Sequence, residues 1–319
     1  MKIAVVGATG LVGRTFVRIL DEDGLHVDRL SLFSGEKSAG EIMSFRGQDI
    51  LVRGLDGSSF DSGYDVCLFA AGADVSREYV PMAVAKGSVV IDNSAEYRSD
   101  PDVPLVVPEV NAHALGRHKG IIANPNCCAA PLTVALWPLM VTFGLDRVVV
   151  STYQSVSGAG LMGLADMESG CANHFPYPIR DNLIPHIDDF GDNGYTGEEI
   201  KIMAETRKIL ENPGLKITVT AVRVPISYCH SQSVNVKFQK ECSIDDVRNA
   251  LSTADGIKVV DRPVHLMYPM PLFSAGQDLV LVGRLRTDTS CPNCVNMWIV
   301  ADNIRKGAAT NALQILKLL

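Results

Sequence analysis

The chain has 319 residues, of which 47% are hydrophobic and 20% are charged, a composition that excludes long disordered tracts and provides apolar surface for two domain cores. Its formal net charge is −7 at pH 7, and no cluster of Lys and Arg is dense enough to follow a phosphate backbone, so we expect no nucleic-acid partner. Eight cysteines without the spacing of a secreted disulfide scaffold indicate a reducing compartment, and we expect a cytoplasmic protein.

Apolar runs and helical periodicity alternate through the first part of the chain. Runs rich in Val, Leu and Ile predict strands, and segments with apolar residues at helical spacing predict helices between them. The expected strands are residues 2–6, 29–33, 65–71, 88–91 and 105–107, and the expected helices are 11–20 and 75–85. This alternation is typical of a mostly parallel sheet with helices on both faces.

A long apolar segment follows at residues 127–145, which carry no charged side chain. The segment is long enough to span a membrane, but it contains Pro131 and Pro138. A buried core helix that bends or stops near Pro138 explains the same segment at lower energetic cost. We therefore expect no membrane span.

From about Val148 onward, longer segments alternate apolar with polar residues, as in an antiparallel sheet with one solvent-exposed face. The expected strands here are 216–224, 233–238, 279–286 and 295–300, and the expected helices are 197–210, 244–252 and 305–318. The predicted fold class is α/β. A mostly parallel sheet domain at residues 1–126, completed by the C-terminal helix at 304–319, precedes an α+β domain with a largely antiparallel sheet at residues 127–303.

A glycine-rich turn joins the first predicted strand to the first predicted helix. Glycines let the backbone approach a pyrophosphate, and the helix amino end supplies N–H groups and partial positive charge. We favour a dinucleotide-binding turn over a purely structural one. It is formed by Gly7, Ala8, Thr9, Gly10, Leu11, Val12 and Gly13.

The segment after the second predicted strand bears on the choice between NAD and NADP. NAD sites usually have an Asp or Glu there that binds the ribose hydroxyls, whereas this chain has Ser34, Lys37 and Ser38. Hydroxyls and a lysine fit the 2′-phosphate of NADP better, so we predict NADP. NAD stays open as the alternative because Glu36 can accept from an unphosphorylated ribose.

Two adjacent cysteines, Cys127 and Cys128, lie just before the predicted apolar helix. A thiol at a helix amino end has a lowered pKa, although cysteines as such are most often buried core residues. Three further residues favour a catalytic role, namely Gln154, Arg223 and His230. Thiolate, amide, guanidinium and imidazole together are suited to covalent acyl chemistry on an anionic substrate.

A second cysteine motif, Cys291 and Cys294 in a C-x-x-C pattern, lies between two predicted strands. No other cysteine pair has zinc-ligand spacing. We interpret the motif as a turn with two ordinary thiols and predict no metal site.

Five motifs, spread over both predicted domains, resemble the aspartate-semialdehyde dehydrogenase family. They are the Gly7–Gly13 turn, Asn124–Cys127, Tyr153–Gly160, Arg223 with His230, and Asp302–Asn311. The resemblance implies a Rossmann-type domain joined to a catalytic and dimerisation domain, in a homodimer or a dimer of dimers. It implies NADPH-dependent reductive dephosphorylation of L-aspartyl 4-phosphate to L-aspartate 4-semialdehyde and phosphate, a step toward lysine, threonine and methionine.

The resemblance also implies catalytic roles for the residues that match. Cys127 matches the nucleophile that forms a thioester, and His230 matches the acid/base residue. Gln154 matches an amide that orients the acyl group, and Asn126 a residue that positions the thiol. Cofactor contacts are implied at Ser157, Gly158 and Asn303.

Four more residues match substrate ligands of the family. Arg223 matches the partner of the α-carboxylate and Glu198 a residue that meets the substrate amine, whereas Arg98 and Lys201 match phosphate ligands. Without the resemblance, Glu198 and Lys201 fit an i,i+3 ion pair on a solvated helix face.

The chain departs from the family at Cys128, because a small hydroxyl residue commonly follows the nucleophile there. Adjacent side chains at a helix start diverge by about 100°, so we expect that Cys127 and Cys128 cannot both face one pocket. Because Cys127 follows Asn126 directly, we assign the nucleophile to Cys127.

Two other functions are weighed against this interpretation. N-acetyl-γ-glutamyl-phosphate reductase uses similar chemistry, but its substrate has an acylated amine, which gives Glu198 no charged partner. A non-catalytic dinucleotide-binding redox sensor needs none of Cys127, Gln154, Arg223 and His230, so their joint presence argues against it.

Overall fold

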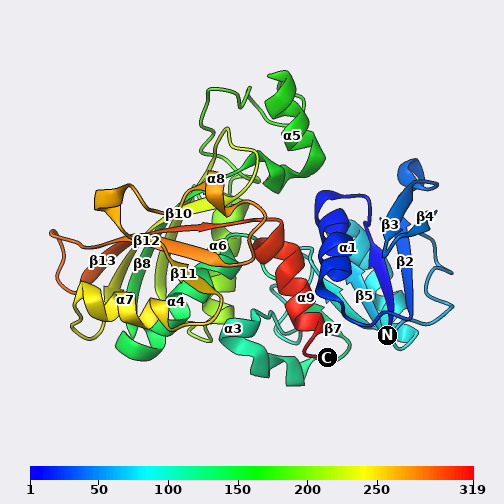
Figure 1. Ribbon diagram of the computed structural model, residues 1–319, viewed down its shortest axis with the longest axis horizontal. Helices are drawn as coiled ribbons and strands as arrows, with labels where there is room; N and C mark the ends of the chain where they lie inside the picture. The colour runs from blue at the N-terminus through cyan, green and yellow to red at the C-terminus, as the bar shows by residue number, and fades with distance from the viewer. The chain divides into compact units, whose positions relative to one another are not determined.

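The structure is a computed structural model that describes all residues from 1 to 319. The chain forms two compact units (Figure 1). The first unit comprises Met1–Pro125 and Ala308–Leu319, and the second comprises Asn126–Gly307. No helix in the structure is long and apolar enough to cross a membrane.

The first unit contains a seven-stranded sheet in the order β3-β4-β2-β1-β5-β6-β7. All neighbouring pairs are parallel except β3 with β4. The strands are β1 (Lys2–Val6), β2 (Arg29–Ser34), β3 (Ile42–Phe45), β4 (Gln48–Gly54), β5 (Val66–Phe69), β6 (Val89–Asp92) and β7 (Ile121–Ala123). The chain leaves β1 for β2 on one side, while β5 pairs with its other side, and ligands bind at such switch points in open α/β sheets.

Strand β1 is buried on both faces, because alternate side chains enter two separate hydrophobic cores. Ile3 and Val5 pack in one core with residues of α1 (Leu11–Asp23) and of α9 (Thr310–Leu316). Ala4 and Val6 pack in the other core with residues of α2 (Ala73–Ala85). The last helix of the chain, red in Figure 1, therefore contributes to the core of the first unit.

The second unit is built on a six-stranded sheet in the order β11-β12-β13-β10-β8-β9. Three pairs are antiparallel, whereas β8–β9 and β11–β12 are parallel. The strands are β8 (Leu145–Gln154), β9 (Lys216–Arg223), β10 (His230–Phe238), β11 (Ile257–Val259), β12 (Val280–Thr287) and β13 (Cys294–Ala301). The helices α4 (Ala129–Phe143), α6 (Gly197–Ile209) and α7 (Ile244–Ser252) pack against the sheet and against one another.

Helix α4 is the apolar segment, and most of its side chains are buried. Of the predicted bend or stop near Pro138, the stop is wrong, since the helix runs through this residue to Phe143 and is followed by Gly144, whose φ is 69°. Pro138 removes only one N–H donor, and burial of most of the apolar residues of the helix offsets that loss.

The predicted fold class is confirmed, with three differences in detail. The β3–β4 hairpin, β7, β8, β11 and three short helices had no predicted bounds, the helices being α3 (Pro108–Asn111), α5 (Gly160–Ser169) and α8 (Pro271–Ser274). Residues 105–107 form only an isolated bridge, from Leu105 to Ala123. The second sheet is mixed because β9 follows β8 after a crossover that contains α6, and such a connection returns the chain in the parallel sense.

Candidate active site

The glycine-rich turn follows β1 and requires glycine at two positions. Gly7 has a φ of 81°, and a Cβ atom there would lie 2.6 Å from the carbonyl oxygen of Ala70. A Cβ atom on Gly13 would lie 2.2 Å from the carbonyl oxygen of Gly7. Helix α1 begins directly after Gly10 and has neither a side-chain cap nor an acidic residue in its first turn. Its first N–H groups therefore fit the pyrophosphate of a dinucleotide.

The residues predicted to bind the ribose phosphate lie at the end of β2. Ser34 is buried, and its hydroxyl donates to the carbonyl oxygen of Gly35 at 3.2 Å. Lys37 is exposed and Ser38 is half-buried, both in the short 3₁₀ turn Glu36–Ser38. Lys37 thus provides an accessible cation just after β2, the strand that pairs with β1.

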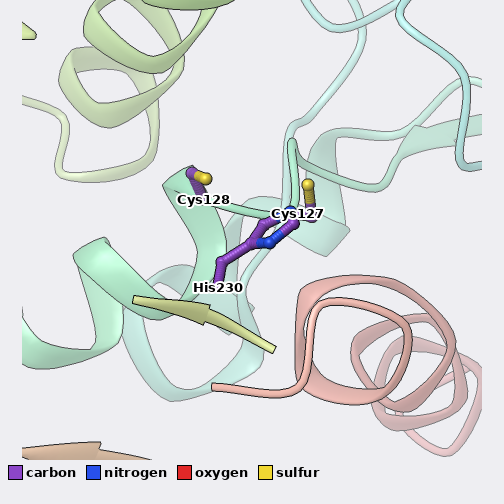
Figure 2. Close-up of side chains that lie close together, drawn as sticks. All are labelled: Cys127, Cys128 and His230. Atoms are coloured by element: carbon purple, nitrogen blue, oxygen red, sulfur yellow. The ribbon is translucent and has the colours of Figure 1, made fainter. Parts of the chain in front are cut away.

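The two cysteines lie in the turn that precedes α4. Asn126 shapes this turn, because its Oδ1 accepts from the backbone N–H of Cys128 at 2.8 Å and of Ala129 at 3.3 Å. The Sγ atoms of Cys127 and Cys128 and one ring nitrogen of His230 all lie within 4.8 Å of one another (Figure 2). The expected divergence does not keep the two thiols apart, although Cys128, the N-cap residue of α4, already has helical backbone angles (φ −94°, ψ −37°).

His230 is the first residue of β10 and is buried. The backbone N–H of Ser155 donates to its Nδ1 at 3.0 Å, and the Ser155 hydroxyl lies 3.1 Å from the same atom. Since a backbone N–H only donates, Nδ1 is the acceptor, and the neutral ring carries its proton on Nε2. Nε2 is buried without a hydrogen-bond partner in the protein, so its proton is free to serve a reacting group.

The two thiols differ in their acidity. A hydrogen bond from Cys128, together with the nearby His230 and Arg223, lowers the pKa of the Cys127 thiol well below its ordinary value despite burial. Burial raises the pKa of Cys128 well above that value. The thiolate therefore forms more readily on Cys127 than on Cys128, and the thiolate is the nucleophilic form.

Glu198, in the first turn of α6, is buried beside the cysteine turn. Its carboxylate accepts from Nδ2 of Asn126 at 3.0 Å and from Nε2 of Gln154 at 3.1 Å. Burial raises the pKa of this carboxyl, and Cys127 raises it further. The alternative of an ion pair with Lys201 is wrong, because the Lys201 ammonium binds Asp188 at 2.7 Å instead.

Arg223 ends β9 directly opposite Gln154 of β8 and is buried. Its Nη1 donates to the carbonyl oxygen of Ser155 at 2.8 Å, whereas its Nε is buried without a partner in the protein. A Cβ atom on Gly158 would lie 2.7 Å from Nη1 of Arg223 and 3.2 Å from Cε1 of His230. Gly158 therefore leaves room for both side chains, and Arg223 keeps a donor for an anionic ligand.

Ser157 and Asn303 contact the hydroxyl of Ser155, the residue that holds His230. The Oδ1 of Asn303 accepts from the Ser155 and Ser157 hydroxyls at 3.1 and 3.3 Å, and its Nδ2 donates to the Ser157 hydroxyl at 3.1 Å. Sequence reasoning missed Ser155, which holds His230. Its place directly after Gln154 was the only available signal.

Arg98 belongs to the first unit and is held by backbone carbonyls. Its Nε donates to Asn124 at 2.9 Å, and its Nη2 donates to Asn93 at 2.7 Å. The loop that carries Arg98 is anchored by buried Asp92, which accepts from the hydroxyls of Ser76 and Ser94, both at 2.6 Å. The second unit thus brings together all the predicted catalytic residues, whereas Arg98, the glycine-rich turn and Ser34–Ser38 lie in the first unit.

Cys127, Cys128 and His230 offer ligand types that zinc prefers. The Ser155 N–H, however, keeps Nδ1 as an acceptor and so puts the ring proton on Nε2. A histidine that binds zinc through Nε2 normally donates from Nδ1 to an acceptor. This environment opposes a resident zinc ion.

Two family models match the chain, the semialdehyde dehydrogenase NAD binding domain at residues 2–118 and the semialdehyde dehydrogenase dimerisation domain at residues 136–306. The aspartate-semialdehyde dehydrogenase of Aquifex aeolicus is 46% identical over 100% of this chain and 97% of its own. The crystal structure of aspartate semialdehyde dehydrogenase II from Vibrio cholerae complexed with ASA superposes with a TM-score of 0.95 at 41% identity, covering 100% of this chain and 97% of that one.

A third similar structure is aspartate semialdehyde dehydrogenase with NADP from Candida albicans, with a TM-score of 0.78 and 27% identity over 100% of this chain and 98% of that one. The resemblance inferred from the motifs is confirmed, and the cofactor of this chain is a nicotinamide dinucleotide.

Proposed function

Because the chain belongs to the aspartate-semialdehyde dehydrogenase family, we propose that it converts L-aspartyl 4-phosphate to L-aspartate 4-semialdehyde and phosphate with NADPH as the reductant. One observation carries the proposal. The Cys127 thiol lies in the turn before α4 and has a lowered pKa. Its sulfur lies within 4.8 Å of a ring nitrogen of His230. A thiolate beside an imidazole N–H is suited to acyl transfer through a thioester.

In the first step the Cys127 thiolate attacks the acyl carbon, the bond to the phosphate oxygen breaks, and phosphate leaves. The carboxamide of Gln154 and the turn held by Asn126 orient the thioester that forms on Cys127. The bound dihydronicotinamide supplies the hydride that reduces the thioester carbon. His230 donates its Nε2 proton to the resulting oxyanion, and it takes the proton back when the hemithioacetal collapses to the aldehyde and the Cys127 thiolate.

The buried charges of the second unit support this choice of substrate. Arg223 binds the α-carboxylate through the donors that face the site, and Glu198 binds the α-ammonium. An acylated amine has neither the charge nor enough N–H donors to satisfy a buried carboxylate. Glu198 therefore favours the aspartyl substrate over that of N-acetyl-γ-glutamyl-phosphate reductase. We assign the phosphate to Arg98 and Lys201.

The segment after β2 also supports a choice between the two dinucleotides. Exposed Lys37 supports NADP over NAD, in line with the NADP named for the Candida albicans relative.

The face of the second sheet opposite α4 carries Tyr153 and Trp298, with rings 5.3 Å apart, beside a depression of about 420 Å³. We propose that this face forms a homodimer, and the eight unpaired thiols fit the cytoplasm.

The test is a spectrophotometric assay of NADP reduction by aspartate semialdehyde, with and without phosphate. We expect reduction that requires phosphate, and at least ~100-fold lower kcat/KM with N-acetylglutamate semialdehyde. Equal turnover of the two aldehydes would reassign the substrate. No reduction of either cofactor would favour the redox sensor.

A further inference from the structure

Cys128 is a buried thiol beside the nucleophile, and the proposed reaction does not use it. Its side chain is fully buried, whereas Cys127 is half-buried. The two Sγ atoms lie within 4.8 Å of each other, and each residue precedes the first residue of α4 (Figure 2). A second thiol at this position has a distinct chemical consequence, because thiols near a reactive cysteine can form a disulfide with it.

Cys127 is also more susceptible to oxidation than buried cysteines such as Cys67 and Cys229. Oxidation follows thiolate character and exposure, and the pKa of Cys127 is lowered. Buried Cys67 and Cys229 have pKa values raised to about 12, so they are thiols at neutral pH and react slowly with peroxides.

We propose that Cys128 is a resolving thiol, which closes a reversible disulfide with Cys127 after a peroxide has oxidised the nucleophile. The disulfide protects Cys127 from irreversible oxidation and switches the enzyme off until a thiol reductant restores it. The loss of activity rests on the proposed function, whereas the formation of the disulfide does not.

The chemistry balances with hydrogen peroxide as the oxidant. The Cys127 thiolate attacks one peroxide oxygen, an S–O bond forms, the O–O bond breaks, and hydroxide leaves and takes up a proton as water. The sulfur is thereby oxidised by two electrons to a sulfenic acid. The Cys128 sulfur then attacks the Cys127 sulfur, the S–S bond forms, and the S–O bond breaks. The hydroxyl group leaves with the thiol proton as a second water.

A disulfide between adjacent residues is strained, and the strain suits a reversible switch. Neighbouring Cα atoms are about 3.8 Å apart, which is shorter than the usual span of about 4.4 to 6.8 Å in disulfides. Asn126 and Gln232 hold the backbone of Cys128, through its N–H at 2.8 Å and its carbonyl oxygen at 2.9 Å. Closing the bond must distort these contacts, so thiol reductants should open it readily.

The experiment uses the full-length protein and intact-mass spectrometry after treatment with an excess of hydrogen peroxide, because oxidation of one thiol to a sulfinic acid consumes two peroxide molecules. We expect the wild type to lose two hydrogen atoms, with a peptide that contains Cys127 linked to Cys128. Dithiothreitol should restore both the mass and the activity to their values before treatment. The Cys128→Ser variant should instead gain oxygen atoms on Cys127, and dithiothreitol should restore less than about a tenth of its own initial activity once sulfinic acid has formed.

Cys291→Ser is the matched control, because it removes the other closely spaced cysteine pair. This variant should still lose two hydrogen atoms. Gain of oxygen by the wild type to the same extent as by Cys128→Ser would overturn the proposal, and so would a disulfide mapped to Cys291 and Cys294. Because the mass change is read without a substrate, its absence is distinguishable from failure of the proposed function, which shows as a lack of turnover before any peroxide is added.

Discussion

The glycine-rich turn of the first unit and the cysteine turn of the second both lie at the amino end of a helix. The first turn depends on its backbone, whereas the second depends on side chains. At Gly7 and Gly13 the absence of side chains lets backbone segments come close. In the cysteine turn, buried side chains such as Glu198, His230 and Arg223 form the site. The comparison teaches that the first turn is sensitive to added volume, whereas the second is sensitive to the loss of a charge or a proton.

The largest expected effect separates chemistry from cofactor binding. Cys127→Ser should lower phosphate-dependent turnover by at least ~10⁴-fold, because a hydroxyl supplies almost no anionic nucleophile at neutral pH. NADPH binding, measured by fluorescence titration, should stay within a few-fold of the wild type. If turnover survives in Cys127→Ser and is lost in Cys128→Ser, the nucleophile is the other thiol.

The next effect divides the cations between two anionic groups of the substrate. Arg223→Leu should raise KM for aspartate semialdehyde by about 100-fold, and Arg98→Leu should raise KM for phosphate by a similar factor, because each loses charge-assisted hydrogen bonds. Initial-rate kinetics with each substrate varied in turn measure both constants. Equal effects of both variants on both substrates would contradict the division.

Added volume tests the glycine-rich turn. Gly13→Ala should raise the dissociation constant of NADPH by about 10-fold or more, because its Cβ would lie 2.2 Å from the carbonyl oxygen of Gly7. Gly116→Ala is the matched control, since it lies in the same unit and its Cβ would meet no atom within 4 Å. Iodoacetamide should alkylate Cys127 at the wild-type rate in both variants. A slower alkylation in Gly13→Ala would mean that the damage spreads beyond the first unit.

The pH dependence of Cys127 tests the second turn. Its lowered pKa keeps the thiolate populated below the ordinary thiol pKa of about 8.5. The alkylation rate should therefore fall only as the pH drops through the lowered value. Cys128→Ala removes a hydrogen-bond donor and should move this fall to higher pH, while Cys128→Ser retains a donor and should move it less. Identical profiles in all three proteins would exclude Cys128 as a donor.

The smallest effect concerns cofactor choice. Lys37→Ala should lower the preference of kcat/KM for NADP over NAD by about 10-fold or less, because Lys37 is exposed and water competes for the 2′-phosphate. Parallel assays with the two cofactors measure the ratio. A wild type that uses both cofactors equally would remove the basis for this assignment.

Prediction from the sequence was most successful where the pattern is local. Helical spacing predicted residues 244–252 with the observed bounds of α7, and apolar runs located β1 and β9 within one residue at each end. The β3–β4 hairpin was missed because Ile42 and Leu51 are apolar although they are exposed, which weakens the alternation of apolar and polar residues along its strands. The parallel pairing of β9 was missed because the alternation of apolar and polar residues within a strand does not indicate which strand lies beside it.

The sequence by itself determined most of the elements and the glycine-rich turn, because these depend on residue types and spacings within a few turns of chain. Motifs spread over both domains identified the reactive groups. Only the tertiary structure decided the state of those groups. Glu198 is buried and accepts a hydrogen bond from Asn126, which lies 72 residues earlier in the chain. His230 accepts a hydrogen bond from the N–H of Ser155, which lies 75 residues earlier. Proton positions and pKa values depend on such partners, since burial and hydrogen bonds across the fold control the energy of each charge.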